Sequence, residues 1–408
     1  MIKKLVCVLL LVCLLCLSTC IMVDVEDISA PQESIAPLIS SPVDRYSPIL
    51  LQAAQVCRDI YETAEHSDSA NVVLSDDTIE QMVDAVASLG HSVIDEDGTL
   101  DMRNPQALME FGTALTSGEA SECSYFTVYR DGHIGICAIG TDYTLFSASA
   151  TFIDEVPEIY LACSDDLTDI QYTDKGWLIY ERDQAGEGNP KQFNIDSHTM
   201  VRIAALPQEY RHLCETYITP VGYSENNLFT TSWTESNYSE IDFSSLYAML
   251  FGMTHDGENL TWYTAKSYYQ QPTGSALYLI PQAEFEATVQ TFLNVSTATL
   301  RSIPEYSAND QGYWFLGWQA GYYNVVPRIP TPEVVDAVYN ADGTITLTVD
   351  ALFSWYGTDR AFTHEVTLRP CTEGTFQYVG NRVISKDNIF PEQELPSHRS
   401  SAIRQLQS

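Results

Sequence analysis

Positively charged residues are scarce in this chain. Its 408 residues include 20 Lys and Arg but 55 Asp and Glu, which gives a net charge of −35 at pH 7. So acidic a surface repels the phosphates of DNA and RNA and disfavours docking on anionic lipid or wall polymer, so the composition excludes a nucleic-acid-binding protein. Hydrophobic residues nevertheless make up 45% of the chain, which indicates a globular protein, and its length allows two or three domains.

The sequence also lacks the common motifs of catalysis and cofactor binding. We find no G-x-S-x-G, S-x-x-K or H-E-x-x-H pattern, and no Walker or Rossmann glycine pattern. Asp95, Asp97 and Gly98 resemble the middle of a calcium-binding loop. An EF-hand, however, would need acidic residues where Val93 and Asn104 stand. We therefore predict a turn there, and neither a metal site nor a cofactor.

Beyond residue 20, no two cysteines form the C-x-x-C pair of a zinc cluster or a thioredoxin-like site. Four of the ten cysteines lie in the N-terminal apolar segment. The other six are Cys57, Cys123, Cys137, Cys163, Cys214 and Cys371. In an exported protein they permit many disulfide connectivities. In an anaerobic bacterium they can equally stay as small buried thiols, which is the arrangement we expect.

The N-terminus has the pattern of an export signal. Lys3 and Lys4 precede Leu5–Leu17, a run of Leu, Val and Cys without a polar side chain. A cationic start followed by an apolar run directs a protein across the membrane. Residues 1–20 are therefore predicted to be a signal peptide or membrane anchor, and the remainder of the chain to be extracytoplasmic.

Three outcomes are open for this segment. In the first, Leu17–Cys20 acts as a lipobox and Cys20 is acylated, although Thr19 stands where a smaller residue is usual. In the second, Leu5–Val23 stays uncleaved and spans the bilayer with the lysines on the cytoplasmic side. In the third, conventional cleavage releases a secreted protein. We favour the first two, which hold the protein at the outer face of the cell membrane.

The segments that flank the body are predicted to lack a fold of their own. Residues 21–48 are rich in Pro, Ser and acidic residues and have no sustained hydrophobic period. Such a segment cannot bury enough apolar surface to fold alone, so we predict a disordered tether. A polar tail of mixed charge over 386–408 is likewise predicted to be flexible.

Between these segments we predict an α+β body whose first domain, over 49–205, has a helical N-terminal portion followed by a β-hairpin. Hydrophobic periodicity predicts helices over 49–66, 77–90 and 105–118. Asp77 and Glu80 have the spacing of a capping box for the second helix. The period then changes to two, and Asp131–Gly132 predicts a type I′ hairpin turn. Strands are predicted over 125–130, 133–139, 144–152, 177–182 and 200–205.

The second predicted α+β domain, over 206–385, has a mixed middle region and ends in an antiparallel β-meander. Helices are predicted over 208–218, 243–253 and 282–293. In Thr344–Ala351, apolar residues alternate with Thr and Asp, which indicates a strand with one buried face. Turns at Asp342–Gly343 and Glu373–Gly374 join the strands of the meander, which are predicted over 334–339, 344–351, 361–368 and 375–379.

One aromatic cluster is the candidate binding surface. Its residues surround three glycines and are Tyr313, Trp314, Trp318, Tyr322 and Tyr323. Such rings can stack on a sugar, or they can pack between domains, which is their more ordinary use because each ring buries a large area. We take Trp314, Trp318, Tyr322 and Tyr323 as the candidate ligand-binding residues.

Histidines and carboxylate pairs are the remaining candidates. His364 shares a strand face with Phe362 and Val366, which predicts a core histidine rather than a catalytic one. His133 and Cys137 share another face, where a structural pair is preferred to a catalytic dyad. A glycosidase needs two facing acids, but chance adjacency among 55 acids explains the adjacent ones. These are Asp154 and Glu155, Asp165 and Asp166, and Glu284 and Glu286.

Several segments together resemble a known family. They are ITPVGYSENNLF (218–229), IPQAEFEATVQTFLNVSTATLRS (280–302), NADGTITLTVDALFSWYGTDRAFTHEVTLRP (340–370), KGWLIYER (175–182) and FQYVGN (376–381). They are similar to an uncharacterised family of exported, often lipoprotein-like proteins of anaerobic gut clostridia, known as a domain of unknown function. The resemblance covers roughly residues 50–385. It implies a Gram-positive cell envelope and transfers no catalytic residue or ligand.

The sequence thus favours a non-catalytic binding or scaffold protein of the cell envelope. The membrane is its predicted partner through the N-terminal anchor, and an envelope glycan or another protein would be its ligand. A carboxylate-dependent envelope hydrolase of the glycosidase type is the alternative, because spacing in sequence does not decide which acids face one another.

Overall fold

The computed structural model describes most of the chain from residue 41 onward. The described ranges are 41–64, 73–153, 156–183, 198–224, 226–255, 257–258, 260, 262–271, 277–315 and 329–386. They belong to two compact units, one within residues 1–205 and one within 206–408. Both units combine helices with largely antiparallel sheets, so the predicted α+β class is confirmed.

The predicted anchor over 1–20 lies outside the described residues, as do residues 21–40 of the predicted tether and residues 387–408 of the predicted tail. Within the described ranges, no helix is both long enough and apolar enough to cross a bilayer. Acylation of Cys20 stays a prediction.

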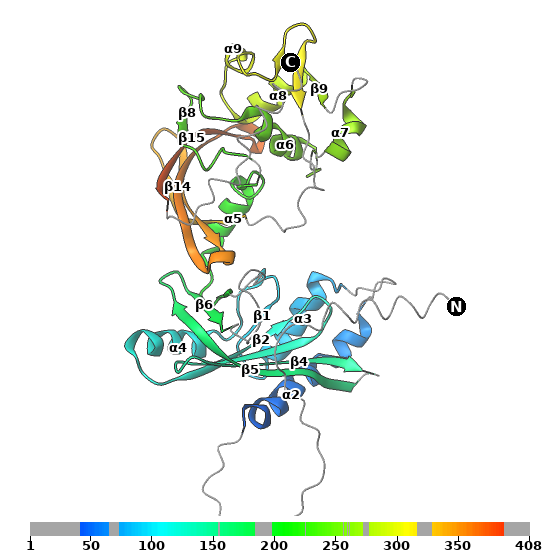
Figure 1. Ribbon diagram of the computed structural model, residues 1–408, viewed down its shortest axis with the longest axis vertical. Helices are drawn as coiled ribbons and strands as arrows, with labels where there is room; N and C mark the ends of the chain where they lie inside the picture. Colours follow the sequence, from blue (N-terminus) through cyan, green and yellow to red (C-terminus); the bar gives the residue numbers. More distant parts are fainter. Residues whose placement is uncertain are drawn as a thin grey trace, which may run out of the picture. The chain divides into compact units, whose positions relative to one another are not determined.

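The described part of the first unit consists of helices around a seven-stranded sheet (Figure 1). The helices are α2 (Pro42–Thr63), α3 (Asp76–Ala87) and α4 (Gln106–Ser117). The strands are β1 (Val93–Asp95), β2 (Glu122–Val128), β3 (Ile134–Gly140), β4 (Thr144–Ile153), β5 (Val156–Tyr172), β6 (Trp177–Arg182) and β7 (His198–Arg202). Their order in the sheet follows the sequence; β1 is parallel to β2, and all other neighbours are antiparallel.

Different helices cover the two faces of this sheet. Helices α2 and α3 bury residues such as Leu50 and Met82 against Ile136 and its neighbours on β2–β4. Helix α4 buries Leu108 and Phe111 in a second core on the opposite face. Because neighbouring residues of a strand point to opposite faces, the central strand β3 contributes to both cores and is buried along its whole length.

Helix α2 begins at Pro42, earlier than the predicted start at residue 49. The Ser41 side chain accepts the backbone N–H of Asp44, and proline at the first helical position costs no hydrogen bond. Tyr46 is buried and stacks on Phe146 with ring centroids 5.4 Å apart, which stabilises this first part of the helix. The prediction of a disordered tether is therefore wrong for residues 42–48.

Two local predictions in the first unit need correction. Ser75, not Asp77, caps helix α3, because its hydroxyl accepts the N–H of Thr78. The turn at Asp131–Gly132 is not type I′, which requires positive φ at both central residues, since only Gly132 has one. The N–H of Tyr129 instead bonds across a three-residue loop, and the glycine occupies its left-handed position.

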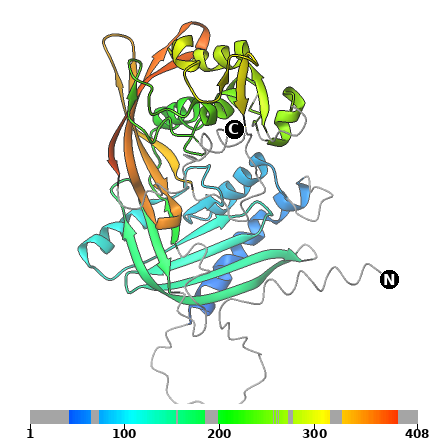
Figure 2. The same ribbon diagram turned by 45° about the horizontal axis from the view of Figure 1, so that its top comes forward.

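The described part of the second unit contains two sheets and a group of helices (Figure 2). The helical elements are α5 (Gln208–Tyr217), α6 (Phe243–Thr254), α7 (Trp262–Tyr268), α8 (Gln282–Phe292) and α9 (Thr297–Leu300), with 3₁₀ turns η2 (Ser354–Tyr356) and η3 (Thr372–Gly374). The strands are β8 (Trp233–Thr234), β9 (Tyr278–Pro281), β10 (Tyr306–Ser307), β11 (Gly312–Phe315), β12 (Thr331–Tyr339), β13 (Ile345–Phe353), β14 (Thr358–Pro370) and β15 (Phe376–Lys386).

The predicted C-terminal meander is confirmed. Its four strands, β12 to β15, are antiparallel in sequence order, and the short strand β8, which was not predicted, pairs with β15 as a fifth strand. A separate sheet has the order β10-β11-β9. Helix α5 packs on β12 and α8 packs on β15, so one core joins the helices to the long strands. Strand β15 extends to Lys386, several residues beyond the predicted end at 379.

Candidate functional site

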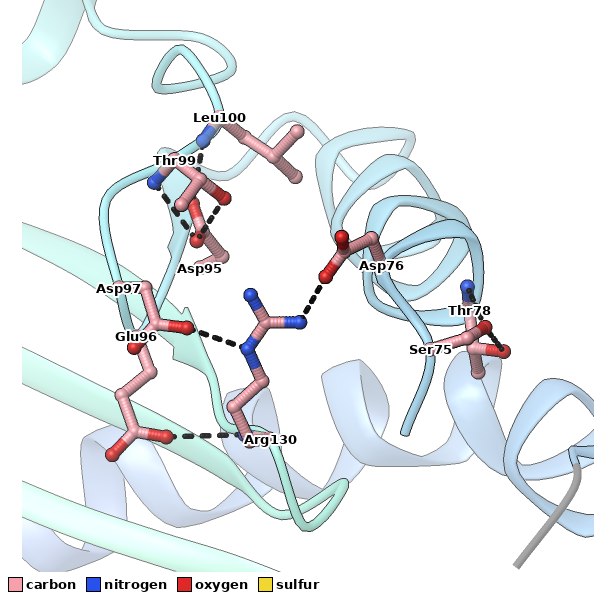
Figure 3. Close-up of polar contacts among 9 residues, drawn as sticks. All are labelled: Ser75, Asp76, Thr78, Asp95, Glu96, Asp97, Thr99, Leu100 and Arg130. Atoms are coloured by element: carbon pink, nitrogen blue, oxygen red, sulfur yellow. Dashed lines mark hydrogen bonds and ion pairs between the residues drawn. The ribbon is translucent and has the colours of Figure 1, made fainter. Parts of the chain in front are cut away.

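An arginine among carboxylates joins three elements of the first unit (Figure 3). Arg130 lies in the loop after β2, and its Nε donates to Oδ2 of Asp97 at 2.5 Å. Its Nη1 forms an ion pair with Asp76 at the start of α3. Its backbone N–H donates to Oε2 of Glu96 at 3.1 Å. The hairpin, the helix and the loop after β1 are therefore held together by charge-assisted hydrogen bonds.

Asp95 at the end of β1 shapes the adjoining loop (Figure 3). Its carboxylate is buried and accepts the N–H and hydroxyl of Thr99 at 3.0 and 2.8 Å, and the N–H of Leu100 at 2.9 Å. These bonds close a turn, so the predicted turn in place of a calcium loop is confirmed. Within the described ranges, no group of three or more His, Cys, Asp or Glu side chains is arranged to hold a metal ion.

The positive charge of Arg130 offsets the negative charges of the carboxylates around it. The hydrogen bonds that Arg130 donates to Asp76 and to Asp97 raise the pKa of Arg130, so the guanidinium stays charged. Both carboxylates already contact this cation, and the arginine is therefore committed to the fold rather than presented to an anionic ligand. Sequence reasoning missed Arg130; the scarcity of basic residues was the signal that would have drawn attention to it.

The carboxylates on α8 are likewise bound to protein groups. Glu286 is buried and receives two hydrogen bonds from Arg301, at 2.7 and 3.0 Å, and one from the Tyr313 hydroxyl at 3.1 Å. The Arg301 hydrogen bond lowers the pKa of Glu286. Glu284 accepts the Tyr269 hydroxyl at 2.6 Å. The two acids thus contact different partners instead of facing one another across a shared space.

The two remaining pairs of adjacent acids do not form a facing pair within the described residues either. Asp165 lies on β5 with Oδ2 3.7 Å from Nη1 of Arg182. Asp166 is exposed beside it. The pair Asp154 and Glu155 lies outside the described residues. No facing pair of the type that a glycosidase uses is brought together by these predicted positions within the described ranges.

The predicted aromatic surface lies only partly within the described residues. Tyr313 and Trp314 are in β11, whereas Trp318, Tyr322 and Tyr323 lie outside the described ranges. Tyr313 is buried and stacks on Phe285 at 3.9 Å, so it serves the core. Trp314 is half-buried. Ligand binding by the four candidate aromatic residues stays a prediction.

His364 is a core histidine, as predicted. It is 0% exposed, its Nδ1 lies 2.7 Å from Oδ1 of Asn381, and its Nε2 lies 3.0 Å from the Tyr223 hydroxyl. Phe229 stacks on the ring with centroids 5.3 Å apart. Burial lowers the pKa of His364 to about 4, so the imidazole is neutral at physiological pH.

The predicted pair of His133 and Cys137 is not formed. His133 contacts Asp131 through Nδ1 and stacks on Tyr129 with ring centroids 3.8 Å apart. The Cys137 sulfur instead lies 3.4 Å from the Tyr180 hydroxyl. All six cysteines of the body are free thiols, but only four of them are buried as expected, because Cys163 is partly exposed and Cys371 is exposed.

Comparisons with known proteins place the chain among proteins without an assigned activity. Residues 49–397 match the model of a family described as a family of unknown function, DUF6070. No curated protein and no solved structure matches the chain.

Proposed function

The chain belongs to the DUF6070 family, a family of unknown function, and we propose that it is a non-catalytic binding or scaffold protein of the cell envelope. In this proposal the protein is exported by a Gram-positive bacterium of the anaerobic gut clostridia and stays at the outer face of the cell membrane. An envelope glycan or another envelope protein is its partner, and nucleic acid is not.

Export and anchoring are supported by the N-terminal sequence. Lys3 and Lys4 before the apolar run Leu5–Leu17 are typical of an export signal, and Leu17–Cys20 has the length and start of a lipobox. Acylation of Cys20 makes the protein a lipoprotein. One acyl-bearing cysteine then holds a strongly acidic body near a surface that its own charge would otherwise repel.

The proposal of a non-catalytic role rests on one observation, which is the set of hydrogen bonds that the buried Glu286 on α8 accepts. A glycosidase acid must keep its proton near neutral pH, which requires a raised pKa. Glu286 has the opposite environment, because Arg301 lowers its pKa. Its hydrogen bonds to Arg301 and Tyr313 are those of a structural anion. Glu284, two residues earlier, is occupied by Tyr269.

Fractionation and intact-mass analysis test the location. We expect the full chain in the membrane fraction, with a diacylglyceryl mass on an N-terminal Cys20. The Cys20→Ala variant should lose this mass and its processing. A chain that still begins at Met1 or Ile2 would instead indicate the uncleaved spanning helix, and a full-length chain in the cell interior would refute an envelope location.

A sedimentation assay tests the absence of catalysis. The detergent-extracted protein is incubated with insoluble peptidoglycan, and the supernatant is analysed for soluble fragments by mass spectrometry. Binding to the pellet without release of fragments supports a glycan-binding role. Release that is lost in Glu284→Gln or Glu286→Gln would establish the hydrolase alternative.

A further inference from the structure

The sheet of the first unit curls around its α4 side. Strand β6 is three strands away from β3 in the sheet, and a flat sheet would separate them by about 14 Å. Yet the Tyr180 hydroxyl on β6 lies 3.4 Å from the Cys137 sulfur on β3 and 2.9 Å from the Tyr125 hydroxyl on β2. The α4 face is therefore concave, and residues of distant strands meet across it.

This concave face changes character along the strands. At one end, Leu108 and Phe111 of α4 fill it together with apolar strand residues such as Ile139. Farther along, polar side chains replace this core. The strand register places Cys137, Ser147 and Cys163 side by side on β3, β4 and β5. The Ser147 hydroxyl lies 3.0 Å from the Cys163 sulfur. The packed core of this face thus continues into a part that hydroxyl and thiol groups line.

Arg182, the last residue of β6, lies two residues beyond Tyr180 and so on the same face of the sheet. Its side chain is 37% exposed, and its Nη1 is 3.7 Å from Oδ2 of Asp165, beyond hydrogen-bond distance. By contrast, Arg301 approaches Glu286 to 2.7 Å. Within the described ranges, the Arg182 guanidinium donates no hydrogen bond to a side chain or a carbonyl. This half-buried guanidinium therefore keeps its donors available.

Aromatic and aliphatic groups lie farther along the concave face. His133 stacks on Tyr129 and meets Tyr160 edge to face, with ring centroids 3.8 and 5.9 Å apart. Leu161 on β5 pairs with Ser149 and so shares the face of Ser147, and Tyr160 is the extra residue of the bulge opposite Ser149–Ala150. Tyr160 and Leu161 are 53% and 45% exposed, although β5 is an inner strand of the sheet. A cation beside exposed rings and an aliphatic side chain is complementary to an anion that carries an apolar body.

We propose that this part of the concave face binds a small organic carboxylate, with Arg182 as its charged contact. A carboxylate fits the two parallel N–H donors of a guanidinium and would replace the long contact to Asp165. The Ser147 hydroxyl supplies a further donor, and the apolar body of the ligand lies against Tyr160 and Leu161. The inference rests on the proposed function in taking the protein as a binding module, and it adds the class of ligand.

Titration calorimetry with phenylacetate tests this site, because phenylacetate joins a carboxylate to one aromatic ring. Phenylacetamide, which lacks only the charge, is the matched ligand control. The full chain in nonionic detergent should bind phenylacetate at least about tenfold more tightly than the amide, as expected when the contact is a charge-assisted pair. Equal binding of the two, or no binding of phenylacetate, would overturn the proposal.

Two variants with opposite expected effects complete the test. Arg182→Gln should weaken phenylacetate binding at least about tenfold, and Asp165→Asn should strengthen it because it removes the competing anion. Arg103→Gln is the control, since Arg103 is bonded to Glu80 and Asp84 elsewhere in the same unit. An unchanged affinity in both Arg182→Gln and Asp165→Asn would refute the site. Membrane fractionation is unaffected by these changes, so failure here is distinct from failure of the envelope location.

Discussion

Acidification should destabilise the second unit through one residue, His364. The tautomer of this histidine follows from its neighbours. The Asn381 amide nitrogen donates to the carbonyls of Phe229 and Thr231 at 3.0 and 2.8 Å, so its oxygen must be the atom that faces the imidazole. Nδ1 of His364 therefore carries the proton, and Nε2 accepts the Tyr223 hydroxyl. A second proton would place a buried charge where this hydroxyl now donates.

The magnitude follows from the pKa difference between the folded and unfolded states. Burial lowers the pKa of His364 to about 4, and the Asn381 hydrogen bond and the charge of Asp350 offset only part of this effect. The unfolded chain, with a pKa of about 6.5, binds the proton more readily, so stability is complete above that pH and falls as the pH decreases. The expected loss is about 1 kcal/mol at pH 5.5 and about 3 kcal/mol at pH 4.

Urea denaturation at pH 7, 5.5 and 4 measures this loss. Trp177 is the only tryptophan before residue 206, so in a Trp177→Phe background the fluorescence reports the second unit alone. The His364→Gln variant should lack the histidine contribution, and the difference between the two proteins should grow by about 3 kcal/mol from pH 7 to pH 4. His212→Gln is the control because His212 is exposed. A difference that stays constant with pH would refute the tautomer and burial argument.

Two further changes test the packing of the two units. Arg301→Met should lower Tm more than Arg382→Met does, because it leaves the buried Glu286 without its cation. The partner of Arg382 is Glu365, which is more exposed. Equal shifts of Tm in calorimetry would contradict this prediction. Gly112→Ala should destabilise the first unit by about 1–3 kcal/mol in urea denaturation, because the added Cβ would lie 2.4 Å from Cγ of Tyr172. In a Tyr172→Leu background the same change should become neutral or stabilising, because alanine favours the helix.

Regular periodicity made most helices and the C-terminal meander predictable, and irregular pairing hid strand β5. Its alternation is interrupted twice, by a bulge opposite Ser149–Ala150 and by another between Leu167 and Asp169. Its first part pairs with β4 and its last part with β6. Each bulge shifts the alternation of buried and exposed side chains by one residue, so no single period of two runs through β5. The strand was therefore not predicted from the sequence.

The sequence predicted where turns and helix caps lie better than it predicted the type of turn or the capping residue. Asp-Gly marked the hairpin between β2 and β3, but the sequence Asp131–Gly132 is compatible with more than one loop geometry. The native loop needs positive φ only at Gly132, and Gly343 occupies the same position in the turn between β12 and β13. Ser41 caps α2 well before its expected start at residue 49, and Ser75 caps α3 just before its expected start at residue 77, so both helices begin earlier than their hydrophobic pattern indicates.

The side-chain contacts were not predictable because they join positions far apart in a chain full of acids. Arg130 reaches Asp76 across 54 positions, and Tyr125 reaches Tyr180 across 55. With 55 acidic residues, the presence of a carboxylate says little about its role, whereas each of the 20 basic residues has many partners available. The informative observation is therefore how an arginine is bonded. An arginine held by two close acceptors, as Arg301 is, stabilises the fold. An arginine whose one ionic partner is distant, as for Arg182, has the donors that we propose for a ligand.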